Sequence, residues 1–265
     1  MAEQIFMMDR VEYYYAADNR VFKNLSLSIQ KGDSICIMGA NGSGKSTLLK
    51  ILCALAFPTG GKFEAFGQEI NEARMQNESL ARDYHRRVGF IFQNSDAQLF
   101  TTRVWDEIAF GPLQLGLSQE EVTTRVEDLL KMLNINHLRD RSPYRLSGGE
   151  KKKVAVASVL ALNPEVLILD EPSSGLDPKT QRWLLELISQ LIRMGRTIIT
   201  STHNLVLAHA ISTRALVLSE QHEMIYDGAT RDVLENRELL MAVNLIDEYC
   251  HIHGEAEHIH QYNHG

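Results

Sequence analysis

The sequence has few cysteines, no long hydrophobic run and no excess of positive charge, and each absence excludes a class of protein. Its three cysteines, Cys36, Cys53 and Cys250, are too few for a disulfide framework and indicate a reducing compartment. No stretch of 18 or more apolar residues occurs, so we expect no segment that spans a bilayer. The start, Met1 to Gln4, lacks the basic and apolar regions of a signal peptide.

The charge balance and the length limit the kind of partner and the number of domains. The chain carries 34 acidic and 27 basic side chains, which gives a formal net charge of −7. Binding to nucleic acid is driven by clustered Lys and Arg, so this balance argues against nucleic acid as the main partner. With 265 residues, of which 44% are hydrophobic, the chain can form one large α/β domain and a short appendage.

Short apolar strands alternate with helical segments along most of the chain. Strand patterns cover residues 5–7, 21–29, 34–38, 62–66, 88–92, 166–169 and 197–201, and a hairpin is predicted over 214–219 and 223–226. Helices are predicted over residues 46–56, 120–133, 150–162, 181–193 and 231–249, and the polar residues 68–87 are predicted to be a loop with some helix. This alternation predicts a mainly parallel sheet, interrupted by a helix-rich insertion over about residues 95–162.

A glycine-rich loop lies between the strand at 34–38 and the helix that follows. It fits the pattern G-x-x-x-x-G-K-[ST] and consists of Gly39, Ala40, Asn41, Gly42, Ser43, Gly44, Lys45, Ser46 and Thr47. Glycines let the backbone wrap around phosphates, and the helix N-terminus adds partial positive charge. We expect Lys45 to reach the β- and γ-phosphates of a nucleotide and the Ser46 hydroxyl to coordinate Mg²⁺.

Two acids, Asp170 and Glu171, end the buried strand at 166–169. In this position Asp170 would hold Mg²⁺, directly or through water, and Glu171 would polarise the attacking water. An apolar strand that ends in Asp-Glu is common by itself. Its pairing with the phosphate loop gives it a functional interpretation.

Further motifs resemble those of ABC ATPases, in order and spacing, along roughly residues 1–230. The segment at Ser147, Gly148, Gly149 and Glu150 resembles the ABC signature, and the segment that ends at Asp177 resembles the D-loop. Gln93 follows the strand at 88–92 as the Q-loop glutamine does, and His203 follows the strand at 197–201 as the switch histidine does. The resemblance implies catalytic roles for Gln93, Glu171 and His203, with Mg²⁺ held by Ser46, Gln93 and Asp170.

Two groups of residues have alternative interpretations. Tyr15 stands where the family has the aromatic ring that stacks on adenine, but alternation puts Tyr13 on the same face, so either ring could serve. We assign the role to Tyr15, and Tyr14 could then belong to the core. The lysines at 151–153 are expected to form a solvated helix start, or to lie near the phosphates of an opposing nucleotide.

The resemblance implies an α/β fold of the P-loop ABC ATPase type, with a mainly parallel core sheet, an antiparallel β subdomain and an inserted helical subdomain. It places a nucleotide-binding domain over residues 1–236, a C-terminal helical extension over 237–250 and a tail over 251–265. In ABC ATPases the signature contacts the ATP of the partner subunit. It therefore implies a dimer, of two copies or of this chain with a paralogue, that uses ATP and Mg²⁺.

Residues 93–100 and 106–112 look like those of energy-coupling-factor importers, except that Ser95 stands where that group usually has proline. This implies a cytoplasmic, peripheral ATPase that drives a transmembrane coupling protein and a substrate-binding membrane subunit. The cargo would be cobalt or nickel ions, or alternatively a vitamin or another small solute. A soluble ABC ATPase that acts on DNA or ribosomes is the alternative of a different class. That class usually has two ATPase domains or a coiled-coil insertion, and neither pattern is seen here.

The last residues are rich in histidine, with possible metal ligands at His251, His253, His258 and His260. Imidazole suits Ni²⁺, Co²⁺ and Zn²⁺. The segment is either a metal-buffering or metal-sensing tail, which would favour cobalt or nickel as cargo, or a solvated polar terminus.

Overall fold

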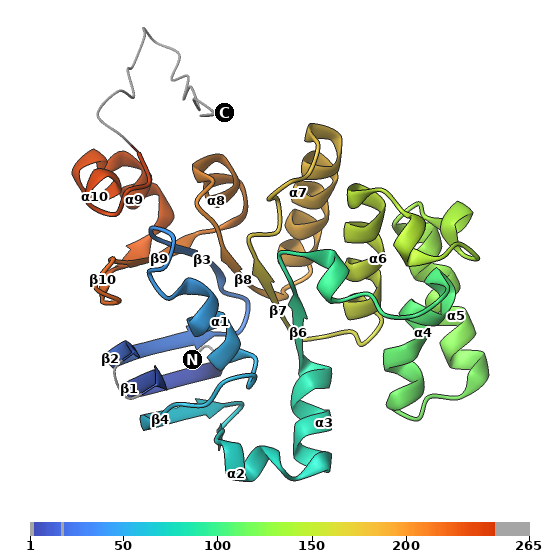
Figure 1. The fold of residues 1–265 in the computed structure, drawn as a ribbon, viewed down its shortest axis with the longest axis horizontal. Coiled ribbons are helices and arrows are strands. Elements are labelled where there is room, and N and C mark those ends of the chain that lie inside the picture. The colour runs from blue at the N-terminus through green and yellow to red at the C-terminus, as the bar shows by residue number, and fades with distance from the viewer. Residues whose placement is uncertain (1–2, 17–18, 247–265) are drawn as a thin grey trace, which may run out of the picture.

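The computed structural model describes residues 3–16 and 19–246, which form two sheets with helices around them (Figure 1). The larger sheet has the strand order β10-β9-β3-β8-β7-β6. Its strands are β3 (Ser34–Met38), β6 (Val88–Ile91), β7 (Val166–Asp170), β8 (Thr197–Ser201), β9 (Arg214–Leu218) and β10 (Met224–Ala229). All neighbours pair in parallel except β9 and β10, which form an antiparallel pair, so the predicted mainly parallel sheet is confirmed.

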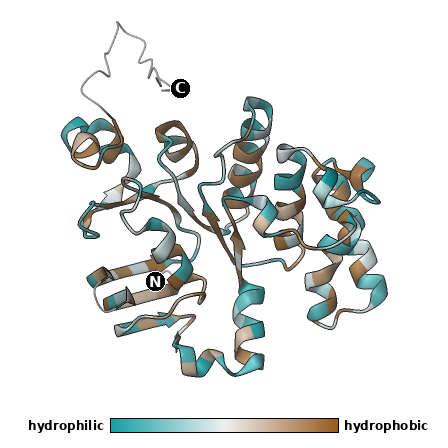
Figure 2. Cartoon of the chain, viewed as in Figure 1, coloured by the Kyte–Doolittle hydropathy of each residue, from teal (hydrophilic) through white to brown (hydrophobic). Residues whose placement is uncertain are grey.

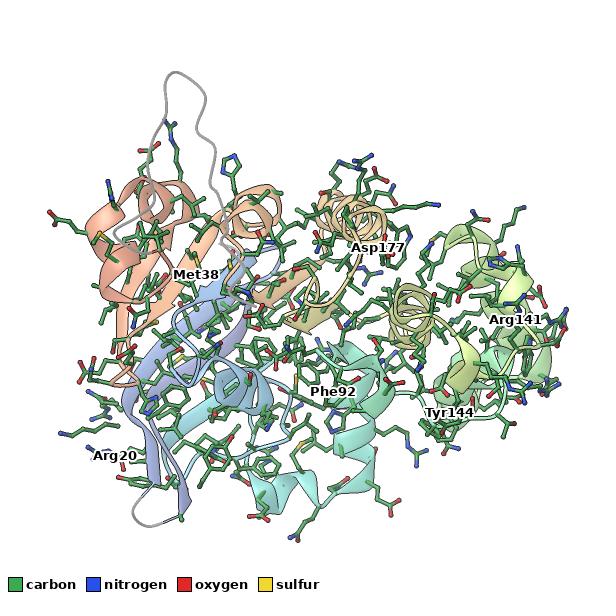
Figure 3. All side chains as sticks on the ribbon, turned by 45° about the horizontal axis from the view of Figure 1, so that its top comes forward. Arg20, Met38, Phe92, Arg141, Tyr144 and Asp177 are labelled. Carbon is green, nitrogen blue, oxygen red and sulfur yellow. The ribbon has the colours of Figure 1, made fainter. Side chains whose placement is uncertain are left out.

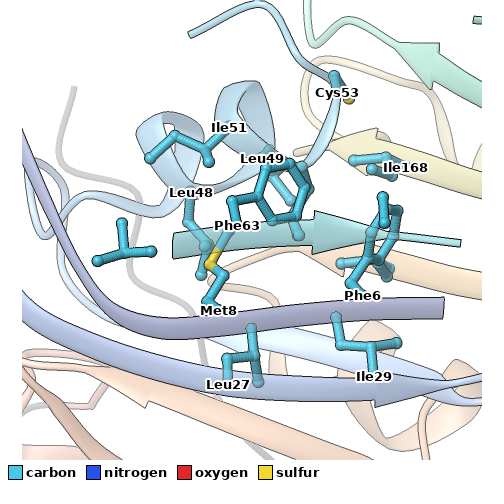
Figure 4. Close-up of a cluster of buried hydrophobic side chains, with 14 of the residues drawn as sticks. Phe6, Met8, Leu27, Ile29, Leu48, Leu49, Ile51, Cys53, Phe63 and Ile168 are labelled. Carbon is cyan, nitrogen blue, oxygen red and sulfur yellow. The ribbon is translucent and has the colours of Figure 1, made fainter. Parts of the chain in front are cut away.

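The smaller sheet is antiparallel and packs through helix α1 (Lys45–Leu52) against the larger one. Its order is β2-β1-β4-β5, with β1 (Gln4–Ala16), β2 (Asn19–Gln30), β4 (Gly60–Ala65) and β5 (Gln68–Glu69). One cluster of buried side chains joins the two sheets and includes Phe6 and Phe63 from the small sheet, Leu49 from α1 and Ile168 from the large sheet (Figure 4). The phosphate loop therefore leads into a helix that is buried between two sheets.

Helices cover about residues 95–162 at one end of the molecule (Figure 1), as predicted. They are α4 (Val104–Gln114), α5 (Gln119–Met132) and α6 (Gly148–Leu160), with short 3-10 turns at Ser95–Ala97, Asn136–Leu138 and Pro143–Arg145. We call these elements the helical block. Its apolar side chains merge with those of β7, β8 and α7 (Pro178–Arg193) in a second cluster. Apolar residues concentrate on the central strands and polar ones on the outer helix faces (Figure 2).

Some predicted helix ends were wrong. Helix α1 ends at Leu52 instead of residue 56, because Ala54 has a positive φ of 52° and the Leu55 N–H turns back to the Lys50 carbonyl. Up to residue 246, the predicted helix over 231–249 is two short ones, α9 (Thr230–Glu235) and α10 (Arg237–Ala242), and residues 247–249 lie outside the described part of the chain. Asn236 has a non-helical ψ of 86° between them, and its side chain caps α10 through the N–H of Leu239.

The remaining helices were less visible in the sequence. The polar segment expected to be mostly loop contains α2 (Glu72–Met75) and α3 (Glu78–Arg87), and α3 buries Tyr84 against the core. Helix α8 (Leu205–Ile211) follows β8 and was not predicted. No helix in the described part of the chain is long and apolar enough to cross a membrane.

Candidate nucleotide-binding and catalytic site

The phosphate loop links the fully buried strand β3 to α1 through a left-handed turn. Gly44 caps α1 with a φ of 103°, and a Cβ there would lie 3.1 Å from the ring of Phe22. Lys45 follows at the helix start, only 7% exposed, and its Nζ donates to the carbonyls of Gly39 at 2.8 Å and Ala40 at 2.9 Å. Burial lowers the pKa of Lys45, while the carboxylates of Glu171 and Asp170 oppose that shift. The loop thus holds a cation that an incoming phosphate could attract.

Tyr15 lies next to this loop at the end of β1. Its ring is 53% exposed, and its hydroxyl shares a 3.0 Å hydrogen bond with Thr47 Oγ1. Tyr13 stacks edge-on against it at 5.0 Å between ring centroids, so the two rings share a face as predicted. Tyr13 also packs against the core, which leaves Tyr15 as the accessible ring.

The expectation that Tyr14 belongs to the core was wrong. It is half-buried and lies outside the core clusters, where Tyr13 takes the inner position instead. Register shifts of β1 against β2 lie between Val11 and Tyr13 and again between Tyr13 and Tyr14. Simple alternation along the strand therefore fails at this point.

The acidic pair at the end of β7 is held by a serine on the neighbouring strand. Ser201 of β8 pairs with Asp170 in the register and is fully buried. Its hydroxyl donates to Asp170 Oδ1 at 2.5 Å and accepts the Glu171 N–H at 3.0 Å. Ser201 is not among the site residues predicted above. In the sequence, Ser201 is a hydroxyl residue at the carboxyl end of a buried strand. That position points to the acidic pair only once β7 and β8 are known to be neighbours.

Glu171 has a backbone conformation that non-glycine residues seldom adopt, with a φ of 40°. Its side chain is directed by His203, whose Nδ1 lies 3.0 Å from Glu171 Oε1. The other carboxylate oxygen, Oε2, is buried and has no hydrogen-bond partner among the described residues. Such an acceptor suits a water molecule.

Gln93 lies after β6, the strand that neighbours β7, and so at the same edge of the sheet as Asp170. Its Nε2 makes a long contact of 3.5 Å with Ser174 Oγ. Ser46 is exposed in the first turn of α1. The oxygens of Ser46, Gln93 and Asp170 are hard donors of the kind that Mg²⁺ prefers, and the neutral ones leave room for phosphate oxygens as further ligands.

The signature segment forms the start of α6. Ser147 caps the helix, and Glu150 Oε2 accepts hydrogen bonds from the Ser147 N–H at 2.9 Å and from its hydroxyl at 2.8 Å. These bonds lower the pKa of Glu150. A Cβ on Gly148 would meet open space, so the amide end of the helix is accessible there. A helix N-terminus of this kind attracts anions.

Gly149 of the signature lies against the start of α7. A Cβ on Gly149 would lie 2.6 Å from Thr180 Oγ1. The Thr180 hydroxyl donates to Asp177 Oδ2 at 2.6 Å, which lowers the pKa of Asp177, and Asp177 caps α7 (Figure 3). The signature and the D-loop are therefore in contact within one chain.

The expectation that the lysines at 151–153 are a solvated helix start was wrong. Lys152 is 2% exposed, and its Nζ donates at 3.0 Å to the carbonyls of both Phe92 and Gln93. Burial lowers the pKa of Lys152 to about 8. Lys151 pairs with Asp96 at 2.6 Å, and Lys153 lies 5.1 Å over the Trp183 ring. These three lysines contact neighbouring segments because the residues after β6 and helix α7 pack against α6.

The possible transition-metal ligands His251, His253, His258 and His260 lie outside the described residues. Within the described part of the chain, no group of three or more His, Cys, Asp or Glu side chains could hold a metal ion.

Comparison with known proteins agrees with this geometry. The sequence profile of the ABC transporter family matches residues 22–174, more than half of the chain. A putative ABC transporter ATP-binding protein of Methanosarcina acetivorans is 49% identical over 97% of this chain and 98% of its own length. The nickel import ATP-binding protein LarO of Lactiplantibacillus plantarum is 46% identical, covering 83% of this chain and 91% of its own. The energy-coupling factor ATP-binding protein EcfA2 of Methanospirillum hungatei is 37% identical over 92% of this chain and 60% of its own.

Solved structures show the same fold. The protein cbiO1 of Clostridium perfringens, described as part of the transporter complex cbiONQ, superposes with a TM-score of 0.78 and 31% identity over 92% of this chain and 95% of its own. The ATP-binding cassette MJ0796, solved as a dimer with ADP and phosphate, gives a TM-score of 0.76 and 27% identity over 86% of this chain and 99% of its own. With its phosphate loop, acidic pair and signature in one P-loop fold, the chain belongs to the ABC transporter family and is an ATP-hydrolysing, ATP-binding subunit.

Proposed function

We propose that this chain is the ATPase of an energy-coupling-factor importer for nickel or cobalt ions, and that it works as a dimer on the cytoplasmic face of the membrane. The observation that carries the membrane part is an exposed aromatic groove at the junction between the core and the helical block. The similarity to the nickel import protein LarO supports the metal cargo.

Within each subunit the proposed roles follow from the geometry. Lys45 and the loop amides hold the phosphates, and Tyr15 offers its exposed ring to the adenine. Ser46, Gln93 and Asp170 would hold Mg²⁺, which neutralises charge on the phosphates when bound. Glu171 accepts a hydrogen bond from the attacking water through its unpartnered Oε2, while His203 keeps its Oε1 occupied.

The dimer completes each site. The Ser147 hydroxyl and the open amide end at Gly148 face outward from α6, and the hydrogen bonds of Ser147 and Glu150 run within their own motif. We infer that these groups bind the nucleotide held by the phosphate loop of the second subunit. The cassette MJ0796, which was solved as a dimer with ADP and phosphate, supports a dimeric assembly. Asp177 would then lie at the dimer interface, because it is in contact with the signature through Thr180.

The groove has a volume of about 290 Å³ and is lined mainly by apolar side chains. Three of its phenylalanines are unusually exposed, namely Phe92 at 36%, Phe100 at 57% and Phe110 at 43%. The rings of Phe100 and Phe110 pack edge to face at 4.9 Å, so the surface is preformed. Glu107, which is 3% exposed, fixes one wall because its Oε2 accepts the N–H groups of Phe100 and Thr101.

Exposed aromatic clusters of this kind mark interaction sites. We infer that the occupant is a cytoplasmic helix of the transmembrane coupling protein, since an importer ATPase must transmit force to a membrane subunit. A displacement of Gln93, which directly follows Phe92, would then reach the membrane subunit through this contact.

Purification of the tagged chain from detergent-solubilised native membranes tests the proposal. We expect a transmembrane coupling protein and a second membrane subunit to co-purify. Reconstituted vesicles with that complex should take up radioactive Ni²⁺ or Co²⁺ only with ATP. Uptake of a vitamin in place of the ions would contradict the metal cargo but not the role as importer ATPase. Co-purification with ribosomes or DNA in place of membrane subunits would overturn the transport function.

A variant sharpens the docking part. Phe110→Ser should release the membrane subunits while the purified chain still hydrolyses ATP. Met132→Ser, which changes a 58% exposed apolar residue on α5 outside the groove, is the matched control and should leave the complex intact.

A further inference from the structure

Hydrogen bonds and an ion pair from three side chains join the segment after β6 to the helix that begins at the signature. Lys152 Nζ donates to the carbonyls of Phe92 and Gln93, both at 3.0 Å. Lys151 pairs with Asp96 at 2.6 Å. Gln98 Nε2 donates at 2.9 Å to the carbonyl of Ala155, one turn further along α6. Segment 92–98 is therefore attached to α6, whereas among the described residues one long hydrogen bond, from Gln93 Nε2 to Ser174 Oγ at 3.5 Å, joins it to the segment before Asp177.

Lys152 is the central contact of the three. It is 2% exposed, and the cost of burying an ammonium group is large unless acceptors compensate for it. A purely apolar side chain of the same length would fill the space without that cost. Packing therefore explains the aliphatic stem of Lys152 but not its ammonium group. That group donates hydrogen bonds to two consecutive backbone carbonyls.

Those two carbonyls belong to residues with different proposed roles. Phe92 lines the docking groove, and Gln93 is a proposed ligand near the nucleotide. Lys152 itself lies five residues after Ser147, in the second turn of the signature helix. One ammonium group thus connects the membrane contact, the nucleotide contact and the helix that faces the partner subunit.

We propose that Lys152 is a positioning residue that makes the backbone of Phe92 and Gln93 move together with the signature helix. Movement of Gln93 toward the nucleotide then carries Ser147 and Gly148 with it. The inference rests on the roles proposed for Gln93 and Ser147, and it adds the side chain that connects them.

Lys152→Met tests the connection, because it keeps the aliphatic stem and removes the donor. Spin labels on Thr124→Cys in α5 and Met194→Cys after α7 report the distance between the helical block and the core, in full-length protein that also carries Cys250→Ser and Glu171→Gln. Burial raises the pKa of the Cys36 and Cys53 thiols, so neither competes for the label. Lys131→Met, an exposed lysine at the end of α5, is the matched control.

We expect Lys152→Met to bind ATP with an affinity within twofold of the parent protein. The ATP-dependent change in label distance should fall by half or more, and in the hydrolysing background kcat should fall at least tenfold with little change in KM. Lys152→Gln, which keeps a donor on a shorter side chain, should give intermediate values and replaces Lys152→Met if that variant does not fold. Lys131→Met should match the parent.

An unaltered distance change in Lys152→Met would overturn the proposal whatever its turnover, since a lower kcat alone would indicate a merely structural role. Absence of any ATP-dependent change in the parent would also overturn it. Failure of the underlying function looks different: Gln93→Ala and Ser147→Ala would then both hydrolyse ATP at the wild-type rate.

Discussion

The nucleotide end of the core sheet and the signature end of the helical block differ in how their polar groups are paired. In the core, side chains from separate strands contact one another, as Ser201 does with Asp170 and His203 with Glu171. At the signature, the hydrogen bonds of the Ser147 and Glu150 side chains to described residues run within their own motif, and the amide end at Gly148 is open. One region is assembled within the chain, and the other has groups that are open to a ligand. The difference supports the proposal that two subunits complete each site.

Loss of the Glu171 carboxylate, in the region assembled within the chain, should lower turnover the most. Glu171→Gln keeps the size of the side chain and removes its basicity, so we expect ATP binding to persist while turnover falls by roughly 10²–10⁴-fold. A closed dimer should accumulate with ATP. Phosphate release and size-exclusion chromatography with light scattering measure both effects. Near wild-type turnover would refute the role assigned to Glu171.

The next prediction concerns whether the phosphate loop and the signature of two subunits act on the same nucleotide. Lys45→Ala removes the buried cation of one half-site, and Ser147→Ala removes the hydroxyl of the other, so each variant alone should lose at least about tenfold in turnover, in line with the loss of a charge-assisted hydrogen bond of about 1.5–3 kcal/mol. If the chain forms homodimers, a mixture of the two variants contains dimers with one intact composite site. Turnover should therefore recover in part on mixing. No recovery in a mixture shown to exchange subunits would mean that the two regions do not share a nucleotide.

A third test asks what Gly149 contributes to the signature region. A methyl group there would lie 2.6 Å from Thr180 Oγ1, so Gly149→Ala should lower the free energy of unfolding by about 2 kcal/mol through overpacking. Thr180→Ala removes the clashing atom, and in the double variant most of the stability should return. Denaturant titration measures both. If the double variant is no more stable than Gly149→Ala, the clash is not the cause.

Removal of the Ser201 hydroxyl, in the same core region, should lower turnover the least. Ser201→Ala removes one buried hydrogen bond to Asp170, so we expect turnover to fall about fivefold, the equivalent of about 1 kcal/mol. Ser201→Thr keeps the hydroxyl and should restore most of the rate. Equal loss in both variants would assign the effect to packing instead.

The short buried strands of the large sheet could be predicted from the sequence, because buried apolar runs are local signals, whereas β1 extends to Ala16 beyond its predicted residues 5–7. The glycine spacing that predicts the phosphate loop is a local signal of the same kind. Lys45 and Glu171 could be identified for the same reason, since each sits at a fixed offset from a strand end. Contacts between distant segments could not be identified in this way. Ser201 becomes meaningful only beside β7, and Thr180 only beside Gly149.

The lysine run shows the same limit in another form. Three consecutive lysines at a helix start are typical of a solvent-exposed surface, and nothing local distinguishes Lys152 from its neighbours. The difference arises because the segment after β6 covers α6 at that position. The C-terminal helix was overpredicted for a related reason: its residues favour helix throughout, and the break at Asn236 depends on one capping side chain.

The left-handed backbone at Glu171 has a consequence for protein engineering. Glycine or asparagine would adopt that conformation with less strain, by about 1 kcal/mol, yet neither offers a carboxylate. A laboratory selection for heat resistance alone would therefore favour replacements at this position that raise the melting temperature and abolish hydrolysis. Thermal robustness and motor output should be screened separately in this chain.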